Sequence, residues 1–257
     1  MTLITARQMV GAEILKLRRN RGVVVVAFLM SVAVLVLFYG YNAIEHASNP
    51  AAYGPAGGVD RFRRAVELLG LYFGGLTAVL IGSEAGTADM ASGVFRDLVA
   101  TGRSRLSLFF VRAPAAIVVT LVINGIGFLL AVAATFVFAG GTPTPDASLV
   151  LQSAGWIVLS NVVLAALAVG LGSLTGSRAV TLTAVIGWQT VATQILLNVT
   201  SLGSARDGLL TASLGHIAPF DFGMGVSVAT GVAVAVVAGW LLIPAAVGAW
   251  RTQTRDA

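Results

Sequence analysis

Four long stretches of this chain contain no charged residue. They cover residues 113–145, 147–177, 179–205 and 222–250. A lipid bilayer has a hydrocarbon core about 30 Å thick, which a helix of roughly 20 apolar residues can cross. An unpaired backbone polar group inside that core costs several kcal/mol, so a chain that crosses it does so as helix. These stretches therefore predict membrane-spanning helices.

Two further apolar runs raise the predicted number of spans to six. The first is Val23–Ala43 and the second, about Leu68–Ser83, is the shortest. The composition agrees, because 57% hydrophobic and 11% charged residues would be extreme for a soluble globular domain. We predict an all-α polytopic membrane protein that forms one transmembrane domain over 1–257. Its spans are predicted at 23–43, 66–84, 113–139, 149–175, 179–199 and 226–250.

Two other interpretations of the first apolar run fit less well. Helices of a soluble core usually show a polar stripe every 3.6 residues, and Val23–Met30 has none. A cleavable signal peptide has an apolar stretch of roughly 7 to 15 residues, which this run exceeds. We interpret it as a retained span.

Basic residues gather on one side of the predicted spans. Of the 16 lysine and arginine residues, all but Arg61, Arg63, Arg64 and Arg206 fall on the side that also holds both termini. Because cytoplasmic loops carry an excess of these residues, we predict cytoplasmic termini. We also expect a multi-pass protein of the inner (cytoplasmic) membrane of a bacterial cell. The net charge of +5 is placed at span ends, next to lipid headgroups, so we expect no nucleic-acid partner.

Three segments outside the spans have recognisable patterns. Residues 1–21 mix apolar and charged side chains, which predicts an amphipathic elbow helix at the cytoplasmic interface; a disordered basic leader is the alternative. Residues 59–67 predict the outer start of span two, where three arginines either pair with Asp60 and Glu67 or bind an anionic substrate. Residues 200–225 hold apolar pieces too short to span, which predicts a broken re-entrant helix on the outer face.

The chain lacks the motifs of the common catalytic sites. It contains no P-loop sequence, and its only lysine is Lys16, so any ATP hydrolysis is expected in a separate partner. Its histidines, His46 and His216, fall in predicted outer loops, and it has no cysteine. Spans three to six carry no ionisable residue in their interiors, whereas ion-coupled transporters usually need one at bilayer depth. We expect a non-catalytic chain with no cofactor or metal of its own.

Neutral polar residues follow one face of predicted span five. Steps of three or four residues place them on one side of a helix, where they line a pathway or pack at a dimer seam, and the sequence leaves both open. These residues are Thr183, Gly187, Thr190, Gln194 and Asn198. Glycine pairs with the spacing that permits close helix approach occur at Gly70 and Gly74, Gly82 and Gly86, and Gly172 and Gly176.

The segment 86–105, between spans two and three, has the most distinctive pattern. Phe95 and Leu98 lie at helical spacing, with Arg96 and Asp97 on the polar side, which predicts a short cytoplasmic amphipathic helix. Together with the six spans and the elbow helix, this segment resembles the integral membrane subunit of ABC exporters of the type-2 (type V) permease class. In that class an acidic residue and a glycine precede a short helix, which ends near Thr-Gly and a Ser-Arg pair. The matching residues are Asp89 or Glu84, Gly93, Leu98, Thr101, Gly102, Ser104 and Arg105.

The resemblance implies a coupling helix that docks onto a separate nucleotide-binding ATPase subunit, which would hold ATP and Mg²⁺. Members of the class work as two permeases with two ATPases, so it also implies a second permease copy, identical or paralogous. Arg96, Arg103 and Arg105 would offer charge-assisted contacts to the ATPase, and Phe95 and Leu98 an apolar anchor.

The role of the acidic residues in this segment stays open at the level of the sequence. Either Glu84 or Asp89 would supply the acidic contact, and Glu84 has the alternative of bracing Arg103 or Arg112. A solvated basic loop that only sets the topology is the other interpretation of the whole segment.

The function expected from these features is outward transport of a hydrophobic or amphipathic compound, such as a drug, a lipid or a peptide, driven by the partner ATPase. Two alternatives belong to other classes. One is a secondary transporter or channel that works alone, and the other is a membrane assembly or immunity factor that binds peptides without transporting them.

Overall fold

The structure is a computed structural model, and it describes residues 3–223 and 225–254. All regular secondary structure in this part of the chain is helical. Six helical segments are long and apolar enough to cross a membrane, which confirms the prediction of an all-helical, multi-pass membrane protein. These segments are Arg21–Ser48, Val59–Ala91, Arg105–Val137, Ala147–Thr175, Arg178–Asn198 and Thr230–Thr254.

Several of these segments are built from more than one helix. Short π-helices interrupt the first and the fifth, and a kink divides the second. The first half of the chain contains α1 (Leu3–Arg19), α2 (Arg21–Phe28), η1 (Leu29–Ala33), α3 (Val34–Ser48), α4 (Val59–Gly70), α5 (Phe73–Ala91), α6 (Val94–Ala100) and α7 (Arg105–Val137). The second half contains α8 (Ala147–Thr175), α9 (Arg178–Ile186), η2 (Gly187–Ala192), α10 (Thr193–Asn198), η3 (Thr200–Gly208), α11 (Leu210–Ile217) and α12 (Thr230–Thr254).

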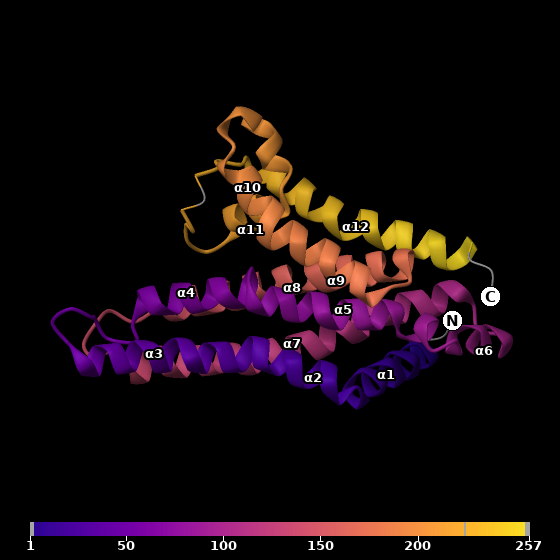
Figure 1. Cartoon of the computed structure of the whole chain (residues 1–257), viewed down its shortest axis with the longest axis horizontal. Helices are drawn as coiled ribbons and strands as arrows, with labels where there is room; N and C mark the ends of the chain where they lie inside the picture. Colours follow the sequence, from indigo (N-terminus) through magenta and orange to yellow (C-terminus); the bar gives the residue numbers. More distant parts are fainter. Residues whose placement is uncertain (1–2, 224, 255–257) are drawn as a thin grey trace.

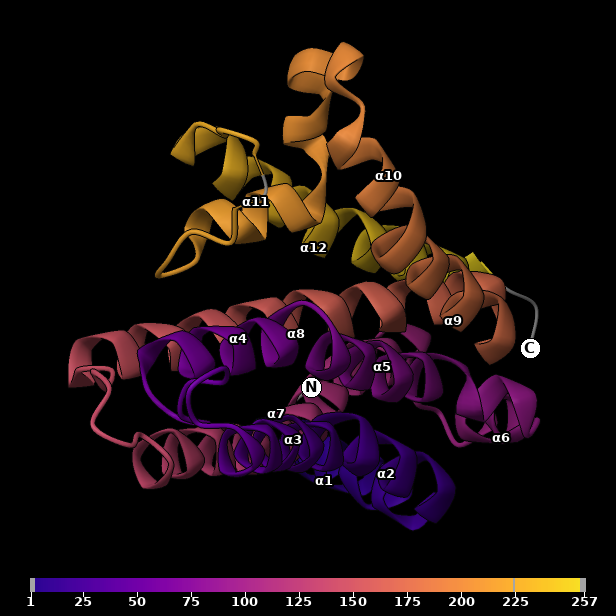
Figure 2. The ribbon, with the colours of Figure 1, turned by 60° about the vertical axis from the view of Figure 1, so that its left-hand side comes forward.

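The helices form three layers. Figure 1 shows α4, α5 and α8 in the middle layer, α1, α2, α3 and α7 on one side of it, and α9 to α12 on the other side. Figure 2, turned by 60°, shows the same order. The start of α1, the helix α6 and the end of α12 lie at one end of the molecule, and the loops before α4 and α8 lie at the other (Figure 1).

Backbone contact between α5 and α8 holds the middle layer together. A Cβ atom added at Gly82 would lie 2.5 Å from the carbonyl oxygen of Ala165, and one at Gly86 would lie 2.7 Å from that of Val169. Side chains at these positions would therefore push the helices apart. On the other side of α8, Gly170 and Gly248 bring α12 equally close, with the added Cβ at Gly248 only 2.6 Å from the Gly170 carbonyl oxygen.

The second spanning segment differs from expectation in its middle and at its C-terminal end. Its helix begins at Val59, as predicted from residues 59–67, but it breaks at Leu71 and Tyr72 and continues to Ala91, beyond the predicted end of the span at residue 84. The side chain of Asn124 supports the break, because its Nδ2 donates to the Gly74 carbonyl oxygen at 3.0 Å and to Asn161 Oδ1 at 2.8 Å. Irregular backbone is tolerated in a spanning segment where it is buried in protein and its polar groups find such partners.

The segment between the fifth and sixth spanning segments folds into two short helical pieces, η3 and α11. The side chains of Leu210 and Leu214 are buried against the middle layer. Trp156 on α8 donates from Nε1 to the Leu214 carbonyl oxygen at 2.8 Å, which ties α11 to α8. The last spanning segment begins at Thr230, four residues later than predicted.

Candidate functional site

The short helix α6 follows α5 and is bounded by two glycines. Gly93, immediately before it, has φ = 74°, and Gly102, after it, has φ = 84°. Both values lie in the left-handed region, where a Cβ atom causes strain. Ser104 then begins α7 by accepting a hydrogen bond from the Ser107 backbone N–H at 3.2 Å. The glycine and serine positions predicted for the coupling segment are therefore its turn and cap residues.

The apolar side of α6 faces its own chain. Phe95, predicted to supply an apolar anchor for a partner, is only 6% exposed, and its ring centroid lies 5.6 Å from the Arg112 guanidinium carbon. The chain itself therefore covers this side chain, which helical spacing alone does not indicate. Leu98 is half-buried, whereas Val94, Arg96 and Asp97 are exposed.

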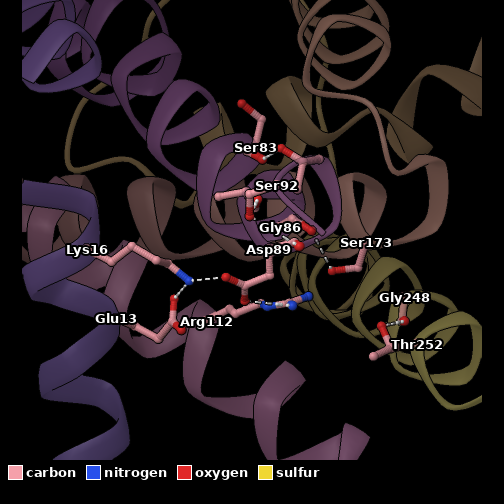
Figure 3. A network of polar contacts seen from close by, with 12 residues as sticks. Glu13, Lys16, Ser83, Gly86, Asp89, Ser92, Arg112, Ser173, Gly248 and Thr252 are labelled. Atoms are coloured by element: carbon pink, nitrogen blue, oxygen red, sulfur yellow. Dashed lines mark hydrogen bonds and ion pairs between the residues drawn. The ribbon is translucent and has the colours of Figure 1, made fainter. Parts of the chain in front are cut away.

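Asp89, near the end of α5, is the centre of a buried ion-pair cluster. Its Oδ2 accepts from Arg112 Nη2 at 3.0 Å and its Oδ1 from Lys16 Nζ at 2.6 Å. Glu13 on α1 pairs with Lys16 at 2.5 Å. Figure 3 shows the Asp89 carboxylate between Lys16 and Arg112. Asp89 is 3% exposed and Arg112 is fully buried, so this carboxylate binds within the chain and offers no surface to a partner.

Glu84 forms a second polar contact one turn earlier on α5. It accepts from Asn20 Nδ2 at 2.7 Å and from Arg178 Nη1 at 3.0 Å. The alternative that Glu84 braces Arg103 or Arg112 is therefore wrong. Asn20 lies between α1 and α2, and Arg178 begins α9, so one carboxylate joins segments far apart in the sequence.

The remaining basic residues of the predicted coupling segment lie nearer the surface. Arg103 is exposed, with Nη1 3.9 Å from Met9 Sδ on α1. Arg105 Nη1 donates to the Gln253 carbonyl oxygen near the end of α12 at 3.1 Å. Thr101 is exposed and caps its own turn by donating to the Leu98 carbonyl oxygen. These contacts connect the segment to the first and the last helices of the chain.

We call Glu84 and Asp89, together with Lys16, Arg112 and Arg178, the acidic hub of α5. The hub connects α5 to α1, α7 and α9. Removal of one partner from a buried ion pair costs roughly 3–5 kcal/mol, because the other charge is left buried and uncompensated. These pairs therefore hold α5 to three other helices near the end that carries α6.

Comparison of the chain with family models, curated proteins and solved structures finds no match.

The polar residues predicted on one face of span five do not form one continuous line. The π-helix η2 adds residues to the turn between Gly187 and Ala192 and so rotates the face partway along. Thr183 is exposed, and Thr190 donates to the Ile186 carbonyl oxygen within its own helix. Gln194 and Asn198 line a cavity of about 210 Å³, which also touches the kink in the second spanning segment.

Most ion-pair partners of Glu84 and Asp89 could not be predicted from the sequence. Lys16 and Asp89 are 73 positions apart, and Glu84 and Arg178 are 94 apart, so no local spacing indicates these pairs. One signal was available. Arg112 is followed by an uninterrupted apolar stretch, and an arginine at such a position needs a counter-ion if it is buried. Among the described residues, no group of three or more His, Asp or Glu side chains is placed to hold a metal ion.

Proposed function

We propose that this chain is the membrane-spanning permease subunit of an ATP-driven ABC exporter, with α6 as the coupling helix at the cytoplasmic end. One observation carries the proposal: the short helix α6 follows α5 after a two-residue turn, and the carboxylates of Asp89 and Glu84 on α5 pair with α1, α7 and α9. A partner that moves α6 would move the ends of several spanning helices together.

The exposed side of α6 is the proposed docking surface for a separate nucleotide-binding ATPase. Val94 is 42% exposed, and Arg96 and Asp97 lie beside it. An exposed apolar side chain within a charged rim is the usual composition of an interface centre. Two ATPase copies would bind two permease chains, identical or paralogous, and would hold the ATP and Mg²⁺ that this chain has no motif to bind.

In the proposed cycle, closure of the ATPase pair displaces α6 and the acidic hub passes the motion to α1, α7 and α9. The fifth and sixth spanning segments lie on the far side of the middle layer, beyond α8 (Figure 2). Movement of α9 against α8 would then open this part of the protein alternately toward the inner and the outer side of the membrane. The substrate class we propose is a hydrophobic or amphipathic compound, since the spanning helices are mostly apolar.

Transport in sealed vesicles tests this function. The chain is co-expressed with candidate P-loop ATPases from the same genome, and ATP hydrolysis and substrate export are measured. We expect both activities to need both subunits. The double variant V94D/R96A should lose both, whereas S92A, on the same loop, should keep them. Export that continues with an ion gradient and no ATP would contradict the proposal.

The two alternatives make other predictions in the same vesicles. A secondary transporter or channel would move substrate without the ATPase, and an assembly or immunity factor would bind peptide without moving it. Asp89 is the buried acid that an ion-coupled transporter would use, but Lys16 and Arg112 already occupy both of its oxygens. This pairing favours the structural role that the exporter proposal gives to Asp89.

A further inference from the structure

Glu67 is a buried carboxylate outside the acidic hub. It lies in the last turn of α4, just before the kink in the second spanning segment, and is 8% exposed. An ionisable group is costly within a membrane-spanning segment and commonly marks a functional site there. Glu67 borders a cavity of about 210 Å³. The other lining residues are Tyr72, Gln194, Leu197, Asn198, Phe222 and Gly223.

The lining of this cavity favours a positive charge. It contains the carboxylate of Glu67 and no lysine, arginine or histidine. Because α4 ends at Gly70, the negative end of its helix dipole points toward the kink. Asn198 donates from Nδ2 to the Gln194 carbonyl oxygen, so its side-chain oxygen remains as an acceptor. Kinked spanning helices commonly bind cations at such carbonyl-rich ends.

Two aromatic rings complete the lining. Tyr72 lies at the kink itself, and Phe222 belongs to the segment that follows α11. Aromatic faces attract ammonium groups through their quadrupole, and they do so more strongly for organic ammonium ions, which shed water easily. A cavity lined by a glutamate, an asparagine and two aromatic residues suits an organic ammonium group better than a small hydrated ion.

A cationic side chain of the protein itself already binds the Glu67 carboxylate. Arg64, three residues before Glu67 on α4, pairs with the Glu67 carboxylate. The Arg64 side chain is 57% exposed, whereas that of Glu67 is 11% exposed. The contact is part-buried, and its arginine is the exposed partner. Arg64 can therefore move into water when another cation takes its place at the carboxylate, so that Glu67 keeps a positive partner.

The size of the cavity limits which part of a ligand it holds. Drug-sized ligands occupy pockets of roughly 300–1,000 Å³, so a cavity of about 210 Å³ accepts a head group only. Ile195, next to Gln194 on α10, is 60% exposed on the membrane-spanning surface. An apolar tail attached to the head group can lie along this surface in the bilayer.

We infer that Glu67 and the kink after α4 bind the ammonium group of an amphipathic cation. The assignment of this cation as the transported substrate rests on the proposed exporter function, whereas its binding does not. The ammonium group comes either from a free amphipathic compound or from an amine-bearing lipid head group, and the same chemistry recognises both.

A binding experiment on the full chain tests the inference without any ATPase. The protein is purified in dodecyl maltoside, an uncharged detergent, and titrated with trimethylammonium-diphenylhexatriene. Binding is followed by energy transfer from tryptophan. E67Q should raise the Kd about tenfold or more, as expected for loss of a charge-assisted contact. R64Q should lower the Kd, because the internal competitor is gone.

Matched controls separate the charge effect from a general change. Uncharged diphenylhexatriene should bind the wild-type chain and E67Q equally. D60N removes an exposed carboxylate of the same helix, whose side chain is 90% exposed, and should leave both Kd values unchanged. Competition by phosphatidylethanolamine but not by phosphatidylglycerol would assign the site to a lipid head group; no competition by either would assign it to free amphipathic cations.

Several results would overturn the inference. An unchanged Kd for the cationic probe in E67Q would do so, as would an equal loss of the neutral probe. If E67Q does not yield a monodisperse protein, the R64Q variant alone tests the site. An unchanged or raised Kd of R64Q for the cationic probe would then refute it. A permease that exports only neutral compounds, with this binding intact, would refute the substrate assignment and leave the exporter function standing.

Discussion

Arg112 on α7 donates to Asp89 on α5 at 3.0 Å, and both side chains are buried at the end of the molecule that carries α6. The guanidinium also lies over the ring of Phe95. Arg112 thus contacts the last turn of α5 and the first turn of α6 simultaneously. Arg112 is therefore one of the side chains that hold α6 against the spanning helices.

R112A should be strongly destabilising, because it leaves Asp89 buried with Lys16 as its remaining partner. We expect a loss of roughly 3–5 kcal/mol in the free energy of unfolding. The loss is measured as a lower midpoint of thermal unfolding by size-exclusion chromatography after heating. R63A removes the partner of the exposed Asp60 and should cost less than about 1 kcal/mol. Equal losses for the two variants would contradict the assignment of a buried pair.

E84Q should loosen the start of α9 without unfolding the chain. Glu84 holds Arg178, whose side chain is 40% exposed, so this pair is weaker than Asp89–Arg112. We expect amide hydrogen exchange over 178–186 to become about fivefold faster, as for the loss of about 1 kcal/mol. Exchange within α8 should stay unchanged. D97N, on the exposed side of α6, is the control, and similar exchange in both variants would count against the role of Glu84.

G82A should separate α5 from α8. The new Cβ would lie 2.5 Å from the Ala165 carbonyl oxygen, so the helices must shift, and overpacking of this kind costs about 1–3 kcal/mol. G125A, on α7, is the matched control, because nothing lies within 4 Å of the added atom. It should be neutral or stabilising by up to about 1 kcal/mol, since alanine favours helix. Thermal midpoints of the two variants give the comparison, and a harmless G82A would refute the backbone contact.

N124A should destabilise the kink in the second spanning segment. It removes the donor to the Gly74 carbonyl oxygen and to Asn161 Oδ1, and both acceptors are buried. An unsatisfied buried acceptor costs about 1–3 kcal/mol. The proteolysis rate between α4 and α5 measures the opening of the kink. N198A removes an exposed amide and should leave this rate unchanged, so a faster cut in both variants would point to a general loss of stability.

The number of spanning helices could be predicted from the sequence because charge-free length is a property of single segments. The helical start of span two was predicted from residues 59–67, but the apolar run itself was placed only from residue 66, because Asp60, Arg61 and Glu67 lower the hydropathy of this half, although Phe62 and Leu69 are buried. Its kink has no proline, and the glycines that flank it are too frequent in this chain to single it out. The glycine pair Gly70 and Gly74 had indicated helix packing only. In the structure Gly70 lies under the Trp156 ring, and Gly74 under the Leu69 carbonyl oxygen.

The site could be located from the sequence, but its contacts could not be assigned. The segment 86–105 stood out through its glycines and its amphipathic spacing, and these residues do form α6 and its turns. Which acid binds which base depends on the packing of helices distant in sequence, and Asp89 shows this, with one partner on α1 and another on α7. The π-helix η2 likewise rotated a face that regular helical spacing had predicted to be continuous.

The glycine contacts between α5 and α8 also have a mechanical consequence. Two helices that touch through their backbones have no flexible side chains between them to absorb a push. We expect α5 and α8 to move as one rigid pair, with α6 next to one end and the kink beside Glu67 toward the other. In the proposed exporter, a displacement at one end of this helix pair would therefore reach the other end, even though no residue at either end touches the other.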